Sequence, residues 1–231
     1  MSDWISFYDF KHSVIYVNAR HRDVHYRIIA EGIHAYVPAH SAAVLDYGCG
    51  EATSADLVAA ASAHLSLVEA APNVRAALAV RYAGNEKISV LTPDEVAARP
   101  AGSFDLIVMH SVTQYLTTAE LDRLLAVFRT LLKPDGLCII GDIVSPKLAA
   151  PAAALALLRF GAAHGFFWAA VGGLIRIFLS DYFRLKKTHG LSHYDEAAML
   201  KRLRAAGFAA RRAPRNIGHN QWRMTFLARL L

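Results

Sequence analysis

Apolar positions along the middle of the chain follow two alternating spacings. Short apolar runs of strand length begin at Ala43 (AVLDYG), Leu65 (LSLVEA), Ile88 (ISVL) and Phe104 (FDLIVMHS). Between them lie stretches such as DLVAAASAH and NVRAALAVRYA, whose apolar residues recur every three or four positions, as in a helix. Strands that alternate with helices are typical of a parallel sheet, so the pattern predicts an α/β fold.

The regions that flank this alternation continue it. Before Pro38, apolar residues at helical spacing predict one or two helices, chiefly over 24–36. A further helix is predicted over 118–132, and KPDG at 133–136 predicts a turn between that helix and a fifth strand, LCIIGDI.

The end of the chain predicts one more helix and the last strands. The helix follows Ser192 or Asp195, either of which can cap it, and ends at Gly207. Segments 208–212 and 222–231 have the composition of strands. With the five earlier strands they predict a doubly wound, mostly parallel sheet of about seven strands.

The segment 149–180 interrupts the alternation and is strongly apolar. The sixteen residues between Arg159 and Arg176 carry no formal charge if the one histidine among them is neutral. A bilayer-spanning helix needs about 20 consecutive apolar residues, and this run is shorter and contains four glycines, among them Gly165, Gly172 and Gly173. We therefore expect a helical insertion after the fifth strand rather than a membrane span.

Length and composition fit a single globular domain. The chain has 231 residues, of which 55% are hydrophobic. We divide this domain, 1–231, into an N-terminal helical cap (1–40), a core (41–145), an apolar helical lid (146–190) and a C-terminal helix with the last strands (191–231). The opening residues MSDWISFYDFK lack a basic, apolar leader, and the two cysteines form no metal-binding pattern, so we expect a cytoplasmic protein with free thiols.

Positive charge is concentrated in the C-terminal third. Residues 1–150 carry 12 Lys and Arg against 16 Asp and Glu, whereas residues 151–231 carry 13 against 3. Such an asymmetry is typical of a solvated basic surface, or of one that meets an anionic partner such as lipid head groups, nucleic acid or an acidic carrier protein.

Three features at successive strand ends point to a nucleoside ligand. The segment VLDYGCGEA, 44–52, runs from a strand into a glycine turn, where a backbone can approach a ligand closely. Glu69 follows the second strand, 21 residues after Gly48, where a carboxylate can accept both hydroxyls of a ribose. Asp94 follows the third strand, where a carboxylate can accept the amino group of adenine.

The order of these motifs resembles that of the class I S-adenosylmethionine-dependent methyltransferases of small-molecule type, over roughly residues 16–145. The resemblance implies S-adenosyl-L-methionine as cofactor and S-adenosyl-L-homocysteine as product. By position, it assigns the methionine part to Asp46, Gly48, Cys49 and Gly50, the ribose to Glu69, and the adenine to Asp94 with Glu95 beside it. Tyr16, with Arg20 as a helper, stands where this family often has an aromatic residue folded over the cofactor.

One departure from the family pattern bears on the cofactor. The third glycine is replaced by Ala52, and Glu51 precedes it. A dinucleotide would place its pyrophosphate at this helix N-terminus, where the charge of Glu51 would repel it. A sulfonium cofactor without phosphate tolerates that charge, so adenosylmethionine is favoured over NAD.

His110 ends the fourth strand and is the leading catalytic candidate. Residues at the carboxyl ends of parallel strands face the ligand crevice, and a neutral imidazole can remove a proton from a methyl acceptor. The alternative is that His110 only contacts the cofactor. His193 and Tyr194 are further candidates for assistance.

Two histidine pairs at helical spacing, His21 with His25 and His189 with His193, could present two imidazoles on one face. Neither pair has an evident third ligand, and a transferase of this family needs no metal. We expect none.

The expected activity is methyl transfer to an oxygen, nitrogen or carbon of a small, hydrophobic metabolite, with the apolar lid over the acceptor. The alternatives are a catalytically inactive adenosylmethionine-binding partner subunit and an RNA methyltransferase. No nucleic acid is expected as a partner, because an aromatic RNP strand, a KH-type loop and an Asn-Pro-Pro-Tyr signature are absent from the sequence. The apolar insertion and its flanking basic residues leave open a peripheral contact with an anionic membrane, an acidic carrier protein, or a homodimer.

Overall fold

A seven-stranded sheet forms the centre of the computed structural model, which describes residues 5–6, 9, 16–148, 150–178 and 192–231. The strand order is β3-β2-β1-β4-β5-β7-β6. The strands are β1 (Ala43–Tyr47), β2 (His64–Val68), β3 (Ile88–Leu91), β4 (Phe104–His110), β5 (Leu132–Ile143), β6 (Phe208–Arg212) and β7 (Met224–Leu230). Strands β1 to β5 pair in parallel, whereas β7 runs antiparallel to both β5 and β6. The predicted mostly parallel seven-stranded α/β fold is confirmed.

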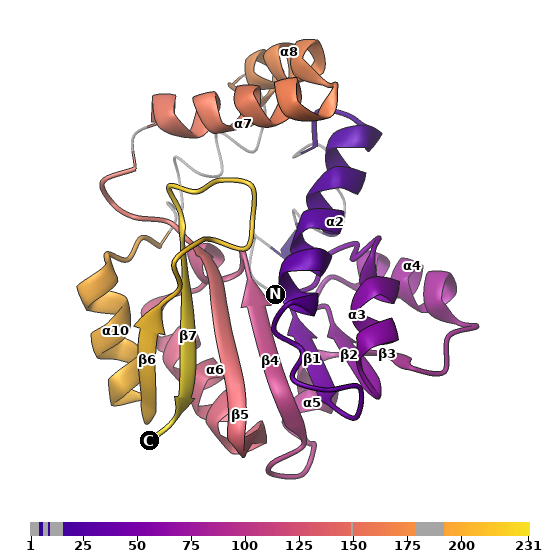
Figure 1. Ribbon diagram of the computed structural model, residues 1–231, viewed down its shortest axis with the longest axis vertical. Helices are drawn as coiled ribbons and strands as arrows, with labels where there is room; N and C mark the ends of the chain where they lie inside the picture. The colour runs from indigo at the N-terminus through magenta and orange to yellow at the C-terminus, as the bar shows by residue number, and fades with distance from the viewer. Residues whose placement is uncertain (1–4, 7–8, 10–15, 149, 179–191) are drawn as a thin grey trace.

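Helices cover both faces of this sheet, as Figure 1 shows. On one face lie α2 (Ala19–His34), α3 (Ala55–Ala61) and α4 (Pro72–Tyr82). On the other lie α5 (Pro93–Ala97), α6 (Thr118–Leu131) and α10 (Glu196–Ala205). Helix α6 begins with a capping box between Thr117 and Glu120 and buries Leu121, Leu125 and Phe128 completely. Burying each such side chain stabilises the fold by about 2 kcal/mol.

Two local expectations need correction. KPDG at 133–136 is not a turn before β5 but part of that strand, which follows α6 directly. In the ladder with β4, Phe104 pairs with Leu132 and Leu106 with Leu137, so residues 133–136 bulge out of the strand. Lys133 in this bulge forms an ion pair with Asp105 at 2.8 Å. The cap of α10 is Asp195, whose carboxylate accepts from Ala198 N at 2.7 Å, and not Ser192, whose hydroxyl donates to Leu116 O.

The insertion after β5 contains α7 (Ala150–His164) and α8 (Phe167–Phe178). Figure 1 shows the two helices across the end of the molecule to which the parallel strands point, above the N-terminal part of α2 and the loop between β6 and β7. Phe160 of α7, Phe166 between the two helices and Ala170 of α8 form a small separate core with Val17. Within the described ranges, no helix is both long enough and apolar enough to cross a bilayer.

Candidate functional site

The turn between β1 and α3 has the backbone geometry of a ligand-binding glycine loop. Gly48 and Gly50 adopt φ of +71° and +59°. A Cβ at Gly48 would lie 2.4 Å from Val112 Cγ2, and one at Gly50 would lie 2.5 Å from Tyr26 Oη. Both positions therefore require glycine, for conformation and for space. The contact with Val112 also places this loop directly against the end of β4.

Glu69 braces the glycine loop from the end of β2. Its Oε2 accepts from Gly50 N at 3.0 Å and its Oε1 accepts from Ala71 N at 2.8 Å. The structure thus brings Glu69, Gly48 and Gly50 together, as the sequence predicted. A carboxylate held at this loop by backbone amides is positioned to accept hydroxyl groups as well.

Asp46, at the end of β1, has a shifted pKa that bears on the charge of the ligand at this half of the site. Burial, together with the nearby Glu69 carboxylate, raises the pKa of Asp46 to about 7. Two carboxylates in one crevice favour a cationic ligand, because a positive group would restore the ionised state of both. Cys49 lies between them, and burial raises the pKa of its thiol well above the usual range, so it is not a nucleophile.

Asp94 and Glu95 lie in the first turn of α5, directly after β3. Glu95 takes part in a capping box: its Oε2 accepts from Thr92 N at 2.7 Å, and its own N–H donates to Thr92 Oγ1 at 3.1 Å. These hydrogen bonds lower the pKa of Glu95. Glu95 therefore shapes the turn, and the exposed Asp94 is the carboxylate presented at this strand end.

The N-terminal cap reaches the glycine loop through two tyrosines. Tyr16 Oη donates to Tyr26 Oη at 3.0 Å, and Tyr26 Oη accepts from Glu51 N at 2.8 Å. Burial raises the pKa of Tyr16 to about 12. Tyr26 was missed by the sequence reasoning, although its position on the buried stripe of α2 was a usable signal. Arg20 instead donates to His164 O at 2.5 Å and ties α2 to α7.

The Glu51 carboxylate has cationic neighbours, whereas from the sequence we expected an isolated negative charge that would repel the pyrophosphate of NAD. Arg22 lies 3.4 Å from its carboxylate, and Arg81 donates to its carbonyl at 2.5 Å. The ion pair weakens the expected repulsion of a phosphate at this turn. A cavity of about 300 Å³ borders these residues on the outer side of the loop, between α2 and α4, and is lined by none of the predicted cofactor residues.

A second polar group lies at the neighbouring ends of β4 and β5. Ser111 and Asp142 both adopt left-handed backbone conformations, with φ of 60° and 65°. Such conformations are costly for residues other than glycine and are concentrated at functional sites. Ser111 Oγ donates to Asp142 Oδ2 at 2.5 Å and lies 3.2 Å from His110 Nδ1.

Asp142 is buried and fully ionised. Burial alone would raise its pKa, but the Arg223 guanidinium, His110 and hydrogen bonds from Ser111 and Asn216 hold the pKa of Asp142 well below its usual range. Arg223 forms an ion pair with Asp142 Oδ2, and Asn216 Nδ2 donates to Oδ1 at 3.1 Å. Asp142 is therefore a fixed negative charge behind Ser111.

This arrangement sets the tautomer of His110. Because the Ser111 hydroxyl donates to Asp142, its oxygen accepts from His110 Nδ1–H, and the lone pair is left on Nε2. Burial lowers the pKa of His110, opposed by Asp142 and reinforced by Arg223, so the ring is neutral at neutral pH. His110 Nε2 is buried and has no hydrogen-bond partner among the described residues.

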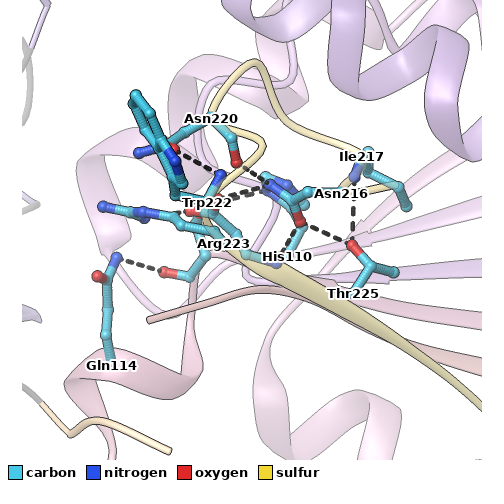
Figure 2. Close-up of polar contacts among 10 residues, drawn as sticks. His110, Gln114, Asn216, Ile217, Asn220, Trp222, Arg223 and Thr225 are labelled. Atoms are coloured by element: carbon cyan, nitrogen blue, oxygen red, sulfur yellow. Dashed lines mark hydrogen bonds and ion pairs between the residues drawn. The ribbon is translucent and has the colours of Figure 1, made fainter. Parts of the chain in front are cut away.

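The loop between β6 and β7, 213–223, closes over this group. Figure 2 shows Asn216 at the centre: it accepts from Thr225 Oγ1 at 2.7 Å and donates to Asn220 O at 3.1 Å. A Cβ at Gly218 would lie 3.3 Å from His110 Nε2, so the backbone of this loop covers the imidazole. An acceptor that reaches Nε2 must displace Gly218.

Three further histidines approach from above. His25 of α2 lies 6.1 Å from His21 and 6.0 Å from His219 between ring centroids, and His219 stacks on Phe160 of α7 at 4.2 Å. Burial lowers the pKa of His21 and of His219 to about 4. In the described part of the chain, no three His, Cys, Asp or Glu residues are placed to hold a metal ion.

The remaining histidine candidates lie elsewhere. His193 is exposed, and His189 lies outside the described residues. The aromatic and basic residues at the end of the insertion, Tyr182, Arg184, Lys186 and Lys187, also lie outside them. Tyr194 is buried in the core, with Arg202 of α10 at 5.6 Å from its ring.

Comparisons with known proteins agree with this geometry. A family model described as a methyltransferase domain matches residues 19–213. Among solved structures, a putative methyltransferase in complex with the Trm112 activator from Haloferax volcanii is 11% identical with a TM-score of 0.64, covering 100% of this chain and 98% of that one. DhpI in complex with SAH is 10% identical with a TM-score of 0.62, covering 98% and 94%.

A third structural neighbour is larger than this chain. It is phosphoethanolamine N-methyltransferase 1 of Haemonchus contortus in complex with phosphoethanolamine and S-adenosylhomocysteine, 18% identical with a TM-score of 0.52. The alignment covers 62% of this chain but only 31% of that protein. No curated protein sequence matches the chain.

Proposed function

Because the chain belongs to the methyltransferase-domain family and is an S-adenosylmethionine-dependent methyltransferase, we propose that it methylates a small, lipophilic molecule whose accepting atom carries a removable proton. The observation that carries this proposal is the buried, neutral His110, whose Nδ1 is engaged by Ser111 and whose Nε2 has no partner among the described residues. Oxygen is the favoured acceptor atom, followed by an acidic carbon, since a neutral amine needs no such base.

The residues at the ends of β1, β2 and β3 fit the cofactor. S-adenosyl-L-methionine, when bound, supplies an electrophilic methyl group. We assign its cationic methionine part to Asp46 and the glycine loop, its ribose to Glu69 and its adenine to Asp94. The raised pKa of Asp46 supports this assignment, because a cation beside it compensates the charge that burial penalises.

The chain then has two tasks, which are to position the acceptor and to move one proton. His110 Nε2 would take the proton of the acceptor oxygen as that oxygen is methylated. The resulting imidazolium is stabilised by Asp142 through the Ser111 hydroxyl. Positioning and base catalysis are the usual means by which a protein accelerates a displacement of this kind.

The lipophilic character of the acceptor is inferred from what lies above His110. Phe160 of α7 and Phe166, in the connection between α7 and α8, are buried there, with Leu157 and Leu158 packed around them. His219 of the closing loop stacks on Phe160, so a shift of this loop would open His110 towards an apolar surface.

Calorimetric titration with adenosylmethionine, adenosylhomocysteine and NAD tests the cofactor site. We expect micromolar binding of the two adenosyl compounds, weakened at least about tenfold by Glu69→Ala and by Asp94→Ala, and unchanged in His110→Gln. Screening of phenols and other hydroxylated hydrophobic compounds with methyl-labelled cofactor then tests the acceptor. Tight cofactor binding with transfer only to RNA, or only in a complex with another protein, would contradict the small-molecule proposal.

A further inference from the structure

Helix α8 is apolar on the side that faces the protein and on the side that faces solvent. Its inner stripe includes Ala170, which is fully buried, and Gly173, where a Cβ would lie 2.1 Å from Val17 Cγ1. Its outer stripe includes Trp168, which is 81% exposed, and Ile175, which is 62% exposed. A surface helix normally carries polar residues on its outer side, and an apolar patch there marks a contact surface.

The neighbouring residues extend this outer surface. Phe167 precedes Trp168 and is 37% exposed, and Leu155 of α7 is 40% exposed. Helices α7 and α8 pack closely, since a Cβ at Gly161 would lie 3.1 Å from Ala170 Cβ. We refer to Leu155, Phe167, Trp168 and Ile175 as the outer apolar patch.

Within α7 and α8, the formally charged residues that accompany the outer apolar patch are cations. The sequence has no Asp or Glu between Asp142 and Asp181. Arg159 and Arg176 are exposed on α7 and α8, and Lys147 precedes α7. Arg159 also lies 6.0 Å from the Trp222 ring, and Arg176 donates to the carbonyls of Tyr16 and Val17 at 3.2 and 3.3 Å. Aromatic and aliphatic side chains flanked by cations, with no acidic residue among them, are complementary to the interface of an anionic bilayer.

We propose that the outer apolar patch docks the protein on an anionic lipid membrane. Trp168 and Ile175 enter the interfacial region, and the positive charges of Lys147, Arg159 and Arg176 attract the anionic lipid surface. A second copy of the chain is disfavoured as the occupant, because a two-fold contact would bring together two copies of a surface that carries cations and no acidic residue. The proposal rests on the proposed function, since α7 and α8 lie over the carboxyl ends of the strands (Figure 1) and a lipophilic acceptor would reach His110 from the bilayer side.

Co-sedimentation of the full chain with vesicles tests the proposal. Vesicles of phosphatidylcholine with phosphatidylglycerol are compared with phosphatidylcholine alone, at low salt and at high salt. We expect binding to the anionic vesicles that weakens at high salt, because part of the attraction is screened. Trp168→Ser and Ile175→Ser should each weaken the partition several-fold, and the double variant at least about tenfold.

Val80→Ser is the matched control, because Val80 on α4 is 80% exposed and far from the insertion. It should bind vesicles as the unaltered protein does. Equal binding to neutral and anionic vesicles, no binding at low salt, or no effect of the double variant would overturn the proposal. A concentration-dependent dimer abolished by Trp168→Ser would overturn it in favour of a second copy, and binding to an acidic carrier protein without vesicle binding would do so in favour of a carrier.

Vesicle binding is measured without cofactor or acceptor, so its failure is distinguishable from that of the proposed function. Loss of vesicle binding with intact cofactor binding and methyl transfer would reject the membrane surface alone. Vesicle binding without methyl transfer to any small molecule would reject the acceptor assignment alone.

Discussion

Ser111 and Asp142 end two neighbouring parallel strands, and the hydroxyl of the first donates to the carboxylate of the second at 2.5 Å. Both residues hold left-handed backbone conformations to make this contact. With His110 the pair forms a buried chain of hydrogen bonds at the carboxyl edge of the sheet, which we call the relay. The proposed catalytic role of the Ser111 hydroxyl can be tested separately from the backbone strain at Ser111.

Ser111→Gly separates the relay from the backbone conformation. Glycine adopts a φ of 60° without strain, which offsets part of the stability lost with the hydrogen bond to Asp142, so we expect only a small fall in melting temperature. The hydroxyl is lost, however, and methyl transfer should fall at least about tenfold. Imidazole NMR should show that His110 no longer holds a fixed tautomer, a change that a purely structural role of Ser111 would not produce.

Ser111→Ala is the companion variant. It also lacks the hydroxyl but keeps the backbone strain, so it should lose the same activity and be less stable than Ser111→Gly. Full activity in either variant would contradict the relay.

His110→Gln tests the base itself. We expect the rate at saturating cofactor and acceptor to fall about 10²- to 10⁴-fold, with cofactor affinity unchanged. Since burial lowers the pKa of His110, the rate of the unaltered enzyme should decline only when the pH falls below the ordinary pKa range of histidine. This decline on the acid side of the pH profile should be absent in His110→Gln. An unchanged rate would leave His110 as a packing residue beside the cofactor.

The sequence predicts most of this fold because the strands are short apolar runs bounded by turn residues. ISVL coincides with β3 and 208–212 with β6. The start of α2 was placed too late, because its first turn is polar and is fixed instead by the Asn18 side chain, which accepts from His21 N at 2.8 Å. KPDG was predicted as a turn but lies within β5, because Pro and Gly favour a turn in sequence-based reasoning whether or not the strand continues.

The carboxylates that we propose for the cofactor were predictable for a similar local reason, since Asp46 lies at the end of β1 and Glu69 and Asp94 follow β2 and β3. The half around Asp142 was not. Asn216 and Arg223 lie 74 and 81 residues further along the chain, and the insertion of β7 between β5 and β6 brings them to Asp142. A lone carboxylate at the end of the buried strand LCIIGD was the one local signal.

Arg223→Met should destabilise the protein by about 3–5 kcal/mol, because it leaves the buried Asp142 carboxylate without its cation. Urea unfolding at pH 7 measures this. Arg212→Met is the matched control: Arg212 pairs with Glu196 at 3.0 Å on the surface, and its loss should cost less than about 1 kcal/mol. Equal effects of the two variants would mean that Asp142 is less isolated from water than its contacts indicate.

The pKa of Asp46 predicts how cofactor affinity depends on pH. With a pKa of about 7, Asp46 is partly protonated at pH 6 and ionised at pH 8. Adenosylmethionine, which carries both a sulfonium and an ammonium, should therefore bind more tightly as pH rises from 6 to 8. Adenosylhomocysteine, which lacks the sulfonium charge, should respond less. In Asp46→Asn the difference between the two ligands should disappear, and a pH-independent preference in the unaltered protein would contradict the assignment of Asp46.

The buried histidines predict a loss of stability in acid. His21 and His219 have folded pKa values of about 4, below the unfolded value of 6.5, so the unfolded state binds protons that the folded state does not. Stability should thus be full above pH 6.5 and fall as pH drops towards 4. For His21 alone the difference corresponds to about 3 kcal/mol.

Asp46 acts in the opposite direction, because its raised pKa makes the folded state take up a proton near pH 7. Urea titrations from pH 8 to 4.5 should show a net loss, steeper in Asp46→Asn and shallower in His21→Phe. The phenylalanine variant also loses the hydrogen bond from Val17 N to His21 Nδ1, so it should be less stable at pH 8, and only the slope of its pH dependence tests the prediction. An unchanged slope in His21→Phe would mean that His21 is hydrated in the folded protein and protonates there as readily as in the unfolded chain.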